Sequence, residues 1–220
     1  MASETLEGLK RAITEYDAQA AARYAQQAVT EAVDPVEAFA AMTAVIKEIG
    51  DRFEAGECWL PDLIGASTAM QAATPILEAE LMRTGGEKES LGTVVAGTVK
   101  GDIHSIGIEM VCTLLLAAGF DVHNLGIDVQ AQKFVDAVKE KKADIVALSA
   151  LLTVTSAEDK KVIDLLVDQG LRKQVKVMVG GGAITSDFAE KIGADGYEAT
   201  APGAVELAKR FVGEAARAPA

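Results

Sequence analysis

The first 84 residues carry apolar side chains at helical spacing. The clearest stretch begins at Asp34 and Pro35, a candidate N-cap followed by proline at the first helical position, and Gly56 marks its end. Apolar residues recur there at intervals of three and four, the spacing of one helix face. They are Phe39, Met42, Val45, Ile46, Ile49 and Phe53.

Similar signals predict further helices on either side of this stretch. Asp17 is a candidate cap for a helix that continues to Ala32, and Pro61 opens another that ends before the glycine pair at 85–86. Pro75 lies inside that last helix, where we expect a kink. The pattern predicts four helices joined by short turns, which is a small bundle.

Beyond a short polar linker expected at residues 85–90, the pattern changes to alternating strands and helices. Strand-like runs occupy 92–99, 120–125, 144–149, 175–180 and about 195–198, and helical patterns occupy 106–118, 129–142, 156–169, 186–192 and 202–216. This alternation indicates an α/β fold with a doubly wound, flavodoxin- or Rossmann-like parallel sheet of five strands. We therefore expect a helical cap domain over 1–88 and an α/β domain over 89–220.

Composition narrows the function classes. Half of the residues are hydrophobic but only 5% are aromatic, so the core is built from small and aliphatic side chains. The net charge of −12 argues against nucleic acid or an anionic membrane as a partner. The two cysteines have no metal-ligand spacing, and no apolar run is long enough for a signal peptide or a membrane span. We expect a cytoplasmic protein with reduced thiols.

One of the only two histidines lies in the hexapeptide DIHSIG, Asp102 to Gly107, between the first strand and the following helix. In an extended segment, side chains at i and i+2 project to the same side. Asp102 can therefore reach one ring nitrogen of His104 while the other nitrogen points outward, as in metal-binding imidazoles. The other histidine, His123, is expected to be structural or exposed.

Two further strand ends carry distinctive residues. The third strand runs into SALLTVTS, which places Ser149, Thr153 and Thr155 at its end, and the fourth runs into Gly180–Gly182. Hydroxyl side chains after a strand often cap the next helix. Three glycines could form a turn, admit a bulky group or cradle a phosphate, and the residues alone leave these readings open. Ligands of parallel sheets bind at the carboxyl ends of strands, where all three motifs fall.

Taken together, the motifs DxHxxG, SxLxT and GG at successive strand ends resemble the cobalamin-binding domain of methionine synthase and of corrinoid methyl-carrier proteins. The resemblance covers residues 90 to 215. It extends to the helical part, because FEAGECWLPDL, Phe53 to Leu63, looks like a segment of the cap domain in those carriers.

The resemblance implies a set of roles around cobalamin bound base-off and His-on. His104 would be the lower axial ligand of cobalt, Asp102 would hold the other imidazole nitrogen, and Thr155 would complete the relay. Methionine synthase has a serine at the position of Thr155, and threonine keeps the hydroxyl. Ser149 and Thr153 would line the channel for the nucleotide tail. The remaining cofactor contacts implied are Ile103, Ser105, Ile106, Gly107, Leu151, Gly180, Gly181 and Gly182, with Trp59 over the upper face.

The implied function is that of a corrinoid protein carrying a methyl group on cobalt, between the cob(I)alamin and methylcobalamin states. A substrate:corrinoid methyltransferase would load it, a methylcorrinoid:acceptor methyltransferase would unload it onto tetrahydrofolate or coenzyme M, and a reductive activase is a further partner. The chain would be a carrier subunit rather than a stand-alone catalyst. Alternatives are a cobalamin-dependent sensor, the cobalamin subunit of a mutase or, outside this class, a flavodoxin-like signalling domain.

Overall fold

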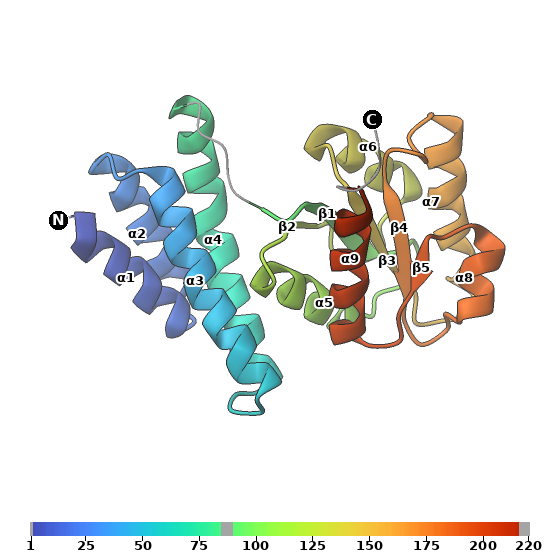
Figure 1. Ribbon diagram of the computed structural model, residues 1–220, viewed down its shortest axis with the longest axis horizontal. Helices are drawn as coiled ribbons and strands as arrows, with labels where there is room; N and C mark the ends of the chain where they lie inside the picture. Colours follow the sequence, from blue (N-terminus) through green and yellow to red (C-terminus); the bar gives the residue numbers. More distant parts are fainter. Residues whose placement is uncertain (1, 85–89, 216–220) are drawn as a thin grey trace. The chain divides into compact units, whose positions relative to one another are not determined.

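The computed structural model describes residues 2–84 and 90–215 (Figure 1). The chain divides into two compact units after Ser90, with the short segment Leu116–Gly119 grouped with the first. The linker expected at 85–90 lies, apart from Ser90, outside the described residues. The domain limits of 1–88 and 89–220 therefore stay a prediction.

The first unit is formed by helices, as the sequence predicts. They are α1 (Ala2–Thr14), α2 (Ala18–Thr30), α3 (Pro35–Glu54) and α4 (Leu60–Thr84). The Asp17 side chain accepts a hydrogen bond from the backbone N–H of Ala20, and Asp34 accepts one from Val36, so both predicted caps are confirmed. Pro75 lies inside α4, which continues past it to Thr84.

The core of the helical unit explains the apolar periodicity of its sequence. Met42 and Ile46 of α3 are fully buried, together with Leu9 and Ile13 of α1. Leu63 and Met70 of α4 are buried here too. They belong to the bundle core, because a side chain buried among neighbouring helices has no surface left for a ligand.

The second unit is a five-stranded parallel sheet with helices between the strands. Its strands are β1 (Thr93–Thr98), β2 (Asp121–Asn124), β3 (Ile145–Ser149), β4 (Lys176–Gly180) and β5 (Gly196–Tyr197), and its helices are α5 (Ile106–Ala117), α6 (Ala131–Lys141), α7 (Ala157–Asp168), α8 (Ser186–Ile192) and α9 (Ala201–Ala215). The strand order is β2-β1-β3-β4-β5, with parallel pairing throughout. This is the flavodoxin-like order of doubly wound sheets, and the predicted fold class is confirmed.

Alternate residues of each strand face opposite layers of helices. Val95, Val146 and Val177 pack in one cluster with apolar side chains of α6, α7 and α8. Their neighbours along the strands, such as Val94 and Ile145, are also buried, and α5 and α9 lie on that other side of the sheet (Figure 1). Strands buried on both faces read as continuous runs of aliphatic residues, which is the pattern in the sequence.

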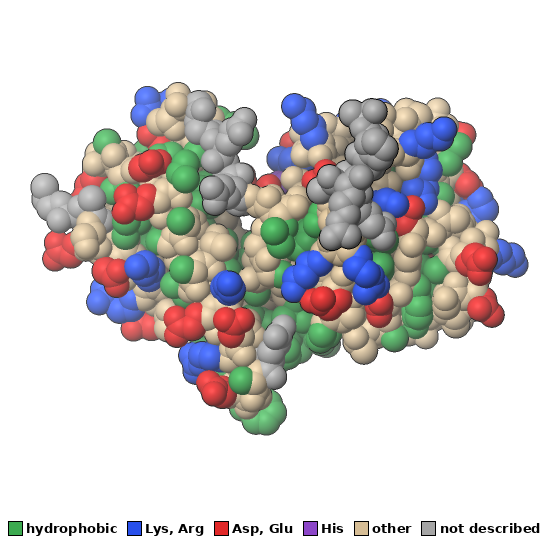
Figure 2. All heavy atoms as spheres, in the orientation of Figure 1, with side chains coloured by type: hydrophobic (Ala, Val, Ile, Leu, Met, Phe, Trp, Pro, Cys, Tyr) green, Lys and Arg blue, Asp and Glu red, His purple; other side chains and the backbone are tan. Residues whose placement is uncertain are grey.

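On the face of the molecule in Figure 2, acidic and basic side chains are interspersed. In the part of the chain that the structure describes, no helix is long and apolar enough to cross a membrane.

Candidate functional site

The candidate site lies where the order of the strands across the sheet reverses, between β1 and β3. After β1 the chain crosses to β2 on one side, whereas β3 pairs with β1 on the other side. The loops that leave β1 and β3 are therefore adjacent and diverge, and doubly wound sheets bind their ligands at such a switch point. DIHSIG forms the first of these loops and SALLTVTS the second, so the fold brings together two motifs about fifty residues apart in sequence.

Asp102 is the centre of the hydrogen bonds that join the two loops. Its side chain is completely buried. Oδ1 accepts hydrogen bonds from the backbone N–H of His104 at 3.1 Å and lies 2.7 Å from His104 Nδ1. Oδ2 accepts from the backbone N–H of Leu151 at 2.8 Å and of Leu152 at 3.3 Å, and from Thr155 Oγ1 at 2.7 Å.

These donors decide the charge of Asp102. Burial alone would raise the pKa of this carboxyl, but the hydrogen bonds from Thr155, His104 and Leu151 outweigh burial and hold the pKa well below its usual range. Asp102 is therefore ionised at neutral pH. An ionised carboxylate only accepts hydrogen bonds, so the Nδ1 of His104 carries the proton that lies between the two side chains.

The protonation of Nδ1 makes the second nitrogen of His104 available as a ligand. A neutral imidazole with its proton on Nδ1 has a lone pair on Nε2. Nε2 has no hydrogen-bond partner among residues 2–84 and 90–215, and 45% of the His104 side chain is exposed. The predicted contact between Asp102 and His104 is confirmed, and it leaves a single oriented nitrogen that faces outward.

Thr155 holds the far oxygen of Asp102. Its hydroxyl lies 2.7 Å from Asp102 Oδ2 and 2.8 Å from the carbonyl oxygen of Leu152, and the residue is buried. The single hydroxyl hydrogen serves one of these two acceptors at a time. When it serves Asp102, the chain His104–Asp102–Thr155 is continuous in hydrogen bonds, as the family resemblance implies.

Asp128, which the sequence analysis did not single out, braces the DIHSIG loop from the side of β2. Its Oδ1 accepts from the backbone N–H of Gly101 at 2.7 Å, and Lys100 Nζ donates to its Oδ2 at 2.9 Å. Its own backbone N–H donates to the carbonyl of Asp102 at 2.9 Å. The available signal was its place just after the second strand, where loops meet at the same edge of the sheet.

The glycines after β4 allow two loops to approach each other. Gly181 has a φ of +110°, and a Cβ at this position would overlap the carbonyl oxygen of Ala150, the residue that follows β3. A Cβ at Gly180 would lie 3.1 Å from the carbonyl oxygen of Glu198. Backbone packing within the chain at the end of β4 therefore explains why these positions are glycine.

The other predicted site residues differ in the unit to which they belong and in how far they are exposed. Trp59 belongs to the helical unit, where 78% of it is exposed. The remaining ones lie at the carboxyl ends of β1, β3 and β4, on the loops or at the adjoining ends of β3, β4 and α5. Ile103, Ile106, Gly107, Leu151, Thr153, Gly181 and Gly182 are exposed there, whereas Ser105, Ser149 and Gly180 are half-buried. The cofactor contacts assigned to these residues stay predictions.

Comparison with known proteins identifies the family. A family model described as a B12 binding domain matches residues 92–206, and a second model with the same description matches residues 5–78. The chain belongs to the B12-binding family. The predicted cofactor, cobalamin, is confirmed at this level, whereas base-off, His-on binding stays a prediction.

Similar B12-binding proteins are corrinoid proteins. Trimethylamine corrinoid protein 1 from Methanosarcina acetivorans is 43% identical over 195 residues, which cover 88% of this chain and 90% of that protein. Dimethylamine corrinoid protein 2 from the same organism is 44% identical, over 83% of this chain and 84% of the relative. The methanol:cobalamin methyltransferase complex MtaBC from Methanosarcina barkeri matches with a TM-score of 0.76 and 27% identity, over 96% of this chain and 80% of the matched one. The predicted resemblance to corrinoid methyl carriers is confirmed.

A second buried carboxyl, Asp159, also escaped the sequence analysis. It is fully buried on α7, and neither of its oxygens has a hydrogen-bond partner in the described part of this B12-binding chain. Its place on the buried face of the helix could have been predicted from the sequence. The spacing of one apolar helix face joins Asp159 with Val162, Ile163 and Leu166.

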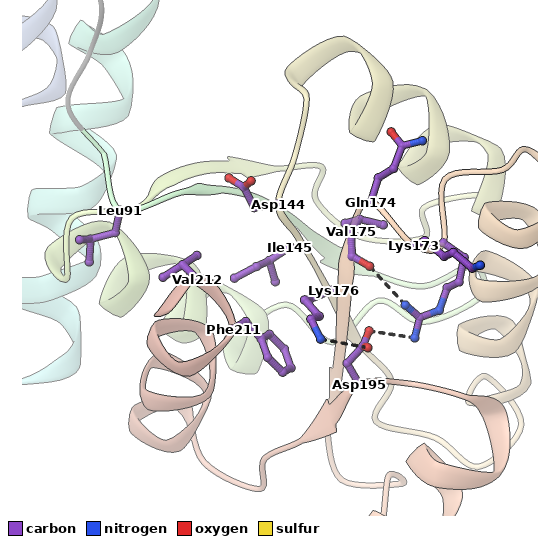
Figure 3. A pocket seen from close by; sticks show the side chains of 11 residues that line it. Leu91, Asp144, Ile145, Lys173, Gln174, Val175, Lys176, Asp195, Phe211 and Val212 are labelled. Carbon is purple, nitrogen blue, oxygen red and sulfur yellow. Dashed lines mark hydrogen bonds and ion pairs between the residues drawn. The ribbon is translucent and has the colours of Figure 1, made fainter. Parts of the chain in front are cut away.

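A hollow of about 680 Å³ lies at the opposite, amino-terminal edge of the B12-binding sheet (Figure 3). Arg172, Lys176 and Asp195 line it together with Phe211. Arg172 Nη2 lies 2.8 Å from Asp195 Oδ2, and Lys176 Nζ lies 3.8 Å from Oδ1. Three of the charged groups at its wall thus pair with one another, and ligands of such sheets bind at the other edge.

Proposed function

We propose that this chain is a corrinoid protein that carries a methyl group between two methyltransferases, with His104 as the lower axial ligand of cobalt. The observation that carries the proposal is the 2.7 Å contact between Asp102 and His104 Nδ1, which leaves Nε2 free at the carboxyl edge of the sheet. Imidazole is a suitable ligand for a first-row transition metal, and a carboxylate on its second nitrogen fixes its orientation and strengthens it as a ligand.

The residues around His104 fit a flat, largely apolar macrocycle with a polar tail. Apolar side chains are exposed on the two loops that carry the site, at Ile103, Leu151 and Val154, and at the first residue of α5, Ile106. Large exposed apolar side chains in one place favour contact with an apolar ligand. The proposed place of the tail is the stretch beside Ser149, Thr153 and the glycines 180–182, where side chains are small.

The bound cofactor supplies the cobalt that accepts and donates the methyl group. The residues of this chain would hold and orient it. Nε2 of His104 would bind from below, Asp102 would keep the ring in place, and the Thr155 hydroxyl would hold Asp102 through Oδ2. A linked chain of hydrogen bonds can exchange a proton when the ligand is released, which would couple coordination to the state of the metal.

The proposed partners follow from the relatives. Two of them are named for trimethylamine and dimethylamine, and a similar structure is part of a methanol:cobalamin methyltransferase complex. We therefore propose that a methyltransferase for a methylated amine loads this chain in the cytoplasm. A second methyltransferase would transfer the methyl group to tetrahydrofolate or coenzyme M, and a reductive activase would restore the cobalt after oxidation.

The test of the ligand is reconstitution with hydroxocobalamin, followed by the visible spectrum of wild type, His104→Ala and His123→Ala. We expect the wild type and His123→Ala to share a spectrum with an imidazole-bound cobalt. His104→Ala should lose it, because no second histidine lies in the loops of the site. A wild-type spectrum that His104→Ala leaves unaltered would exclude His104 as the ligand.

A further inference from the structure

Asp159 has an environment that a carboxyl group rarely occupies. None of its surface is exposed, and both of its oxygens lack hydrogen-bond partners among the residues that the structure describes. It lies on the buried face of α7 with Val162 and Leu166. A buried polar group without a partner lowers stability, so such a group calls for an explanation in function.

The surroundings of Asp159 hold its proton on at neutral pH. Burial is the largest cause and the negative charges of Asp102 and Glu158 add to it, raising the pKa of Asp159 to about 8. Asp102 acts from the loop after β1, and Glu158 is the adjacent residue on α7 itself. Among the described residues, these two carboxylates are the charged groups that raise the pKa of Asp159.

The position of Asp159 connects it with the residues behind His104. Helix α7 begins at Ala157, directly after the loop in which Thr155 donates its hydrogen bond to Asp102. The backbone N–H of Asp159 donates to the carbonyl of Ser156, in the first turn of the helix. Electrostatic coupling is mutual, so a charge on Asp159 acts on Asp102 as much as the charge of Asp102 acts on Asp159.

We propose that Asp159 is a buried proton-binding group whose charge sets the strength with which the Asp102–His104 pair holds cobalt. This inference rests on the proposed function, because it concerns the ligand bond of His104. When Asp159 loses its proton to solvent, a second negative charge stands behind Asp102 and stabilises positive charge on the imidazole and the metal. When Asp159 is protonated, that charge is absent and the bond is weaker. Asp159 is thus a positioning residue that makes coordination depend on pH.

The experiment compares wild type with Asp159→Asn, which has nearly the shape of the protonated acid. Both are loaded with methylcobalamin, whose upper ligand does not exchange a proton, and visible spectra are recorded across a pH series. We expect the wild-type bands to shift with a midpoint near pH 8, the pKa of Asp159. The shift should be absent in Asp159→Asn at equal cofactor loading.

A matched control is Glu158→Gln, the neighbouring carboxylate, which forms a half-exposed ion pair with Lys161. Because Glu158 raises the pKa of Asp159, its loss should move the midpoint to lower pH without removing the shift. Superimposable pH series for wild type and Asp159→Asn would overturn the inference. The proposed function would still stand in that case, provided that His104→Ala changes the spectrum.

A second measurement needs no cofactor and no variant. The carboxyl ¹³C resonance of Asp159 in the wild-type apoprotein should titrate near pH 8. Titration in the ordinary range of an aspartate, around pH 4, would overturn the inference even if Asp159→Asn failed to fold.

Discussion

The two edges of the parallel sheet are each organised around an aspartate, and they differ in the nitrogen-bearing side chain that the aspartate meets. At the amino edge, Asp195 accepts from the backbone N–H of Val177 at 2.7 Å and pairs with Arg172 at 2.8 Å (Figure 3). At the carboxyl edge, Asp102 accepts from backbone N–H groups and from Thr155, and pairs with His104. Arginine is always charged and only donates, so the Asp195 pair is self-contained.

Histidine changes the outcome because it has a second nitrogen. The carboxylate takes Nδ1–H, and the lone pair of Nε2 is then left available to a metal. The aspartate at one edge of the sheet therefore forms a self-contained pair, whereas the aspartate at the other edge leaves its partner able to bind a ligand. The hollow of about 680 Å³ at the amino edge shows that volume alone does not identify a site. The kind of polar atom that is left unpaired is a better guide to the site.

Replacing each of the two aspartates by alanine tests this difference most strongly. Asp102→Ala removes the acceptor of the hydrogen bonds that join the loops after β1 and β3. We expect cobalamin affinity to fall by about 10- to 100-fold and the free energy of unfolding to fall by about 2–4 kcal/mol. Asp195→Ala should lower the free energy of unfolding by about 1–3 kcal/mol and leave cobalamin affinity unchanged.

Spectral titration with cobalamin and urea unfolding of the apoproteins provide the two measurements. An equal loss of cobalamin affinity in both variants would show that the two edges do not differ in function.

Glycines at the two edges give the next largest effect. Gly181 at the carboxyl edge has a φ of +110° and would place a Cβ against Ala150, whereas Gly170 at the amino edge has a φ of +72° and open space around it. Gly181→Ala should cost about 3 kcal/mol of stability, because strain and overlap add. Gly170→Ala should cost about 1 kcal/mol, the price of the left-handed conformation alone. Equal shifts in urea unfolding would mean that the loops at the carboxyl edge separate easily.

Asp159 adds a pH dependence of stability that is specific to the carboxyl side. Its pKa is about 8 in the folded state and about 3.9 in an unfolded chain. Below about pH 4 it is protonated in both states. As pH rises from there to about 8, only the unfolded state loses the proton, so folded stability falls.

Between about pH 5 and about pH 7, this loss amounts to about 2–3 kcal/mol relative to Asp159→Asn, which has no carboxyl to titrate. Unfolding in urea across this range, with both apoproteins side by side, measures the difference. A constant difference in free energy of unfolding at all these pH values would contradict a raised pKa for Asp159.

Thr155 has the smallest expected effect. Thr155→Val removes the hydroxyl that donates to Asp102 and keeps the volume, so stability should fall by about 1–2 kcal/mol. Thr155→Ser keeps the hydroxyl and should retain the hydrogen bond and the spectrum of the bound cofactor. If valine and serine variants behaved alike in unfolding and in spectrum, the hydroxyl would have no part in holding Asp102.

Local sequence patterns were sufficient for the helices, the strands and the Asp102–His104 contact. The caps at Asp17 and Asp34 and the two-residue spacing of the pair act through neighbours in the chain, and such effects do not depend on the rest of the fold. The contact from Thr155 to Asp102 spans 53 residues, and it was predicted through the family resemblance rather than through any local pattern.

Other parts of the site depended on non-local packing. The backbone N–H groups of Leu151 and Leu152 carry no signal in a sequence, because every residue except proline has one. Their role follows from the pairing of β1 with β3, which sets the two loops side by side. Asp128 likewise became visible as a brace only when its loop was placed next to Gly101.

Asp159 shows the difference between what local sequence patterns determine and what non-local packing determines. Its helical spacing with Val162 and Leu166 assigns it to the buried face of α7 from the sequence, since periodicity is a property of consecutive residues. Whether a buried carboxyl finds a partner depends on side chains that arrive from elsewhere in the chain, and here none of the described ones does. Its proton is held by burial and by the charge of Asp102, two effects that arise only when β1, β3 and α7 are assembled.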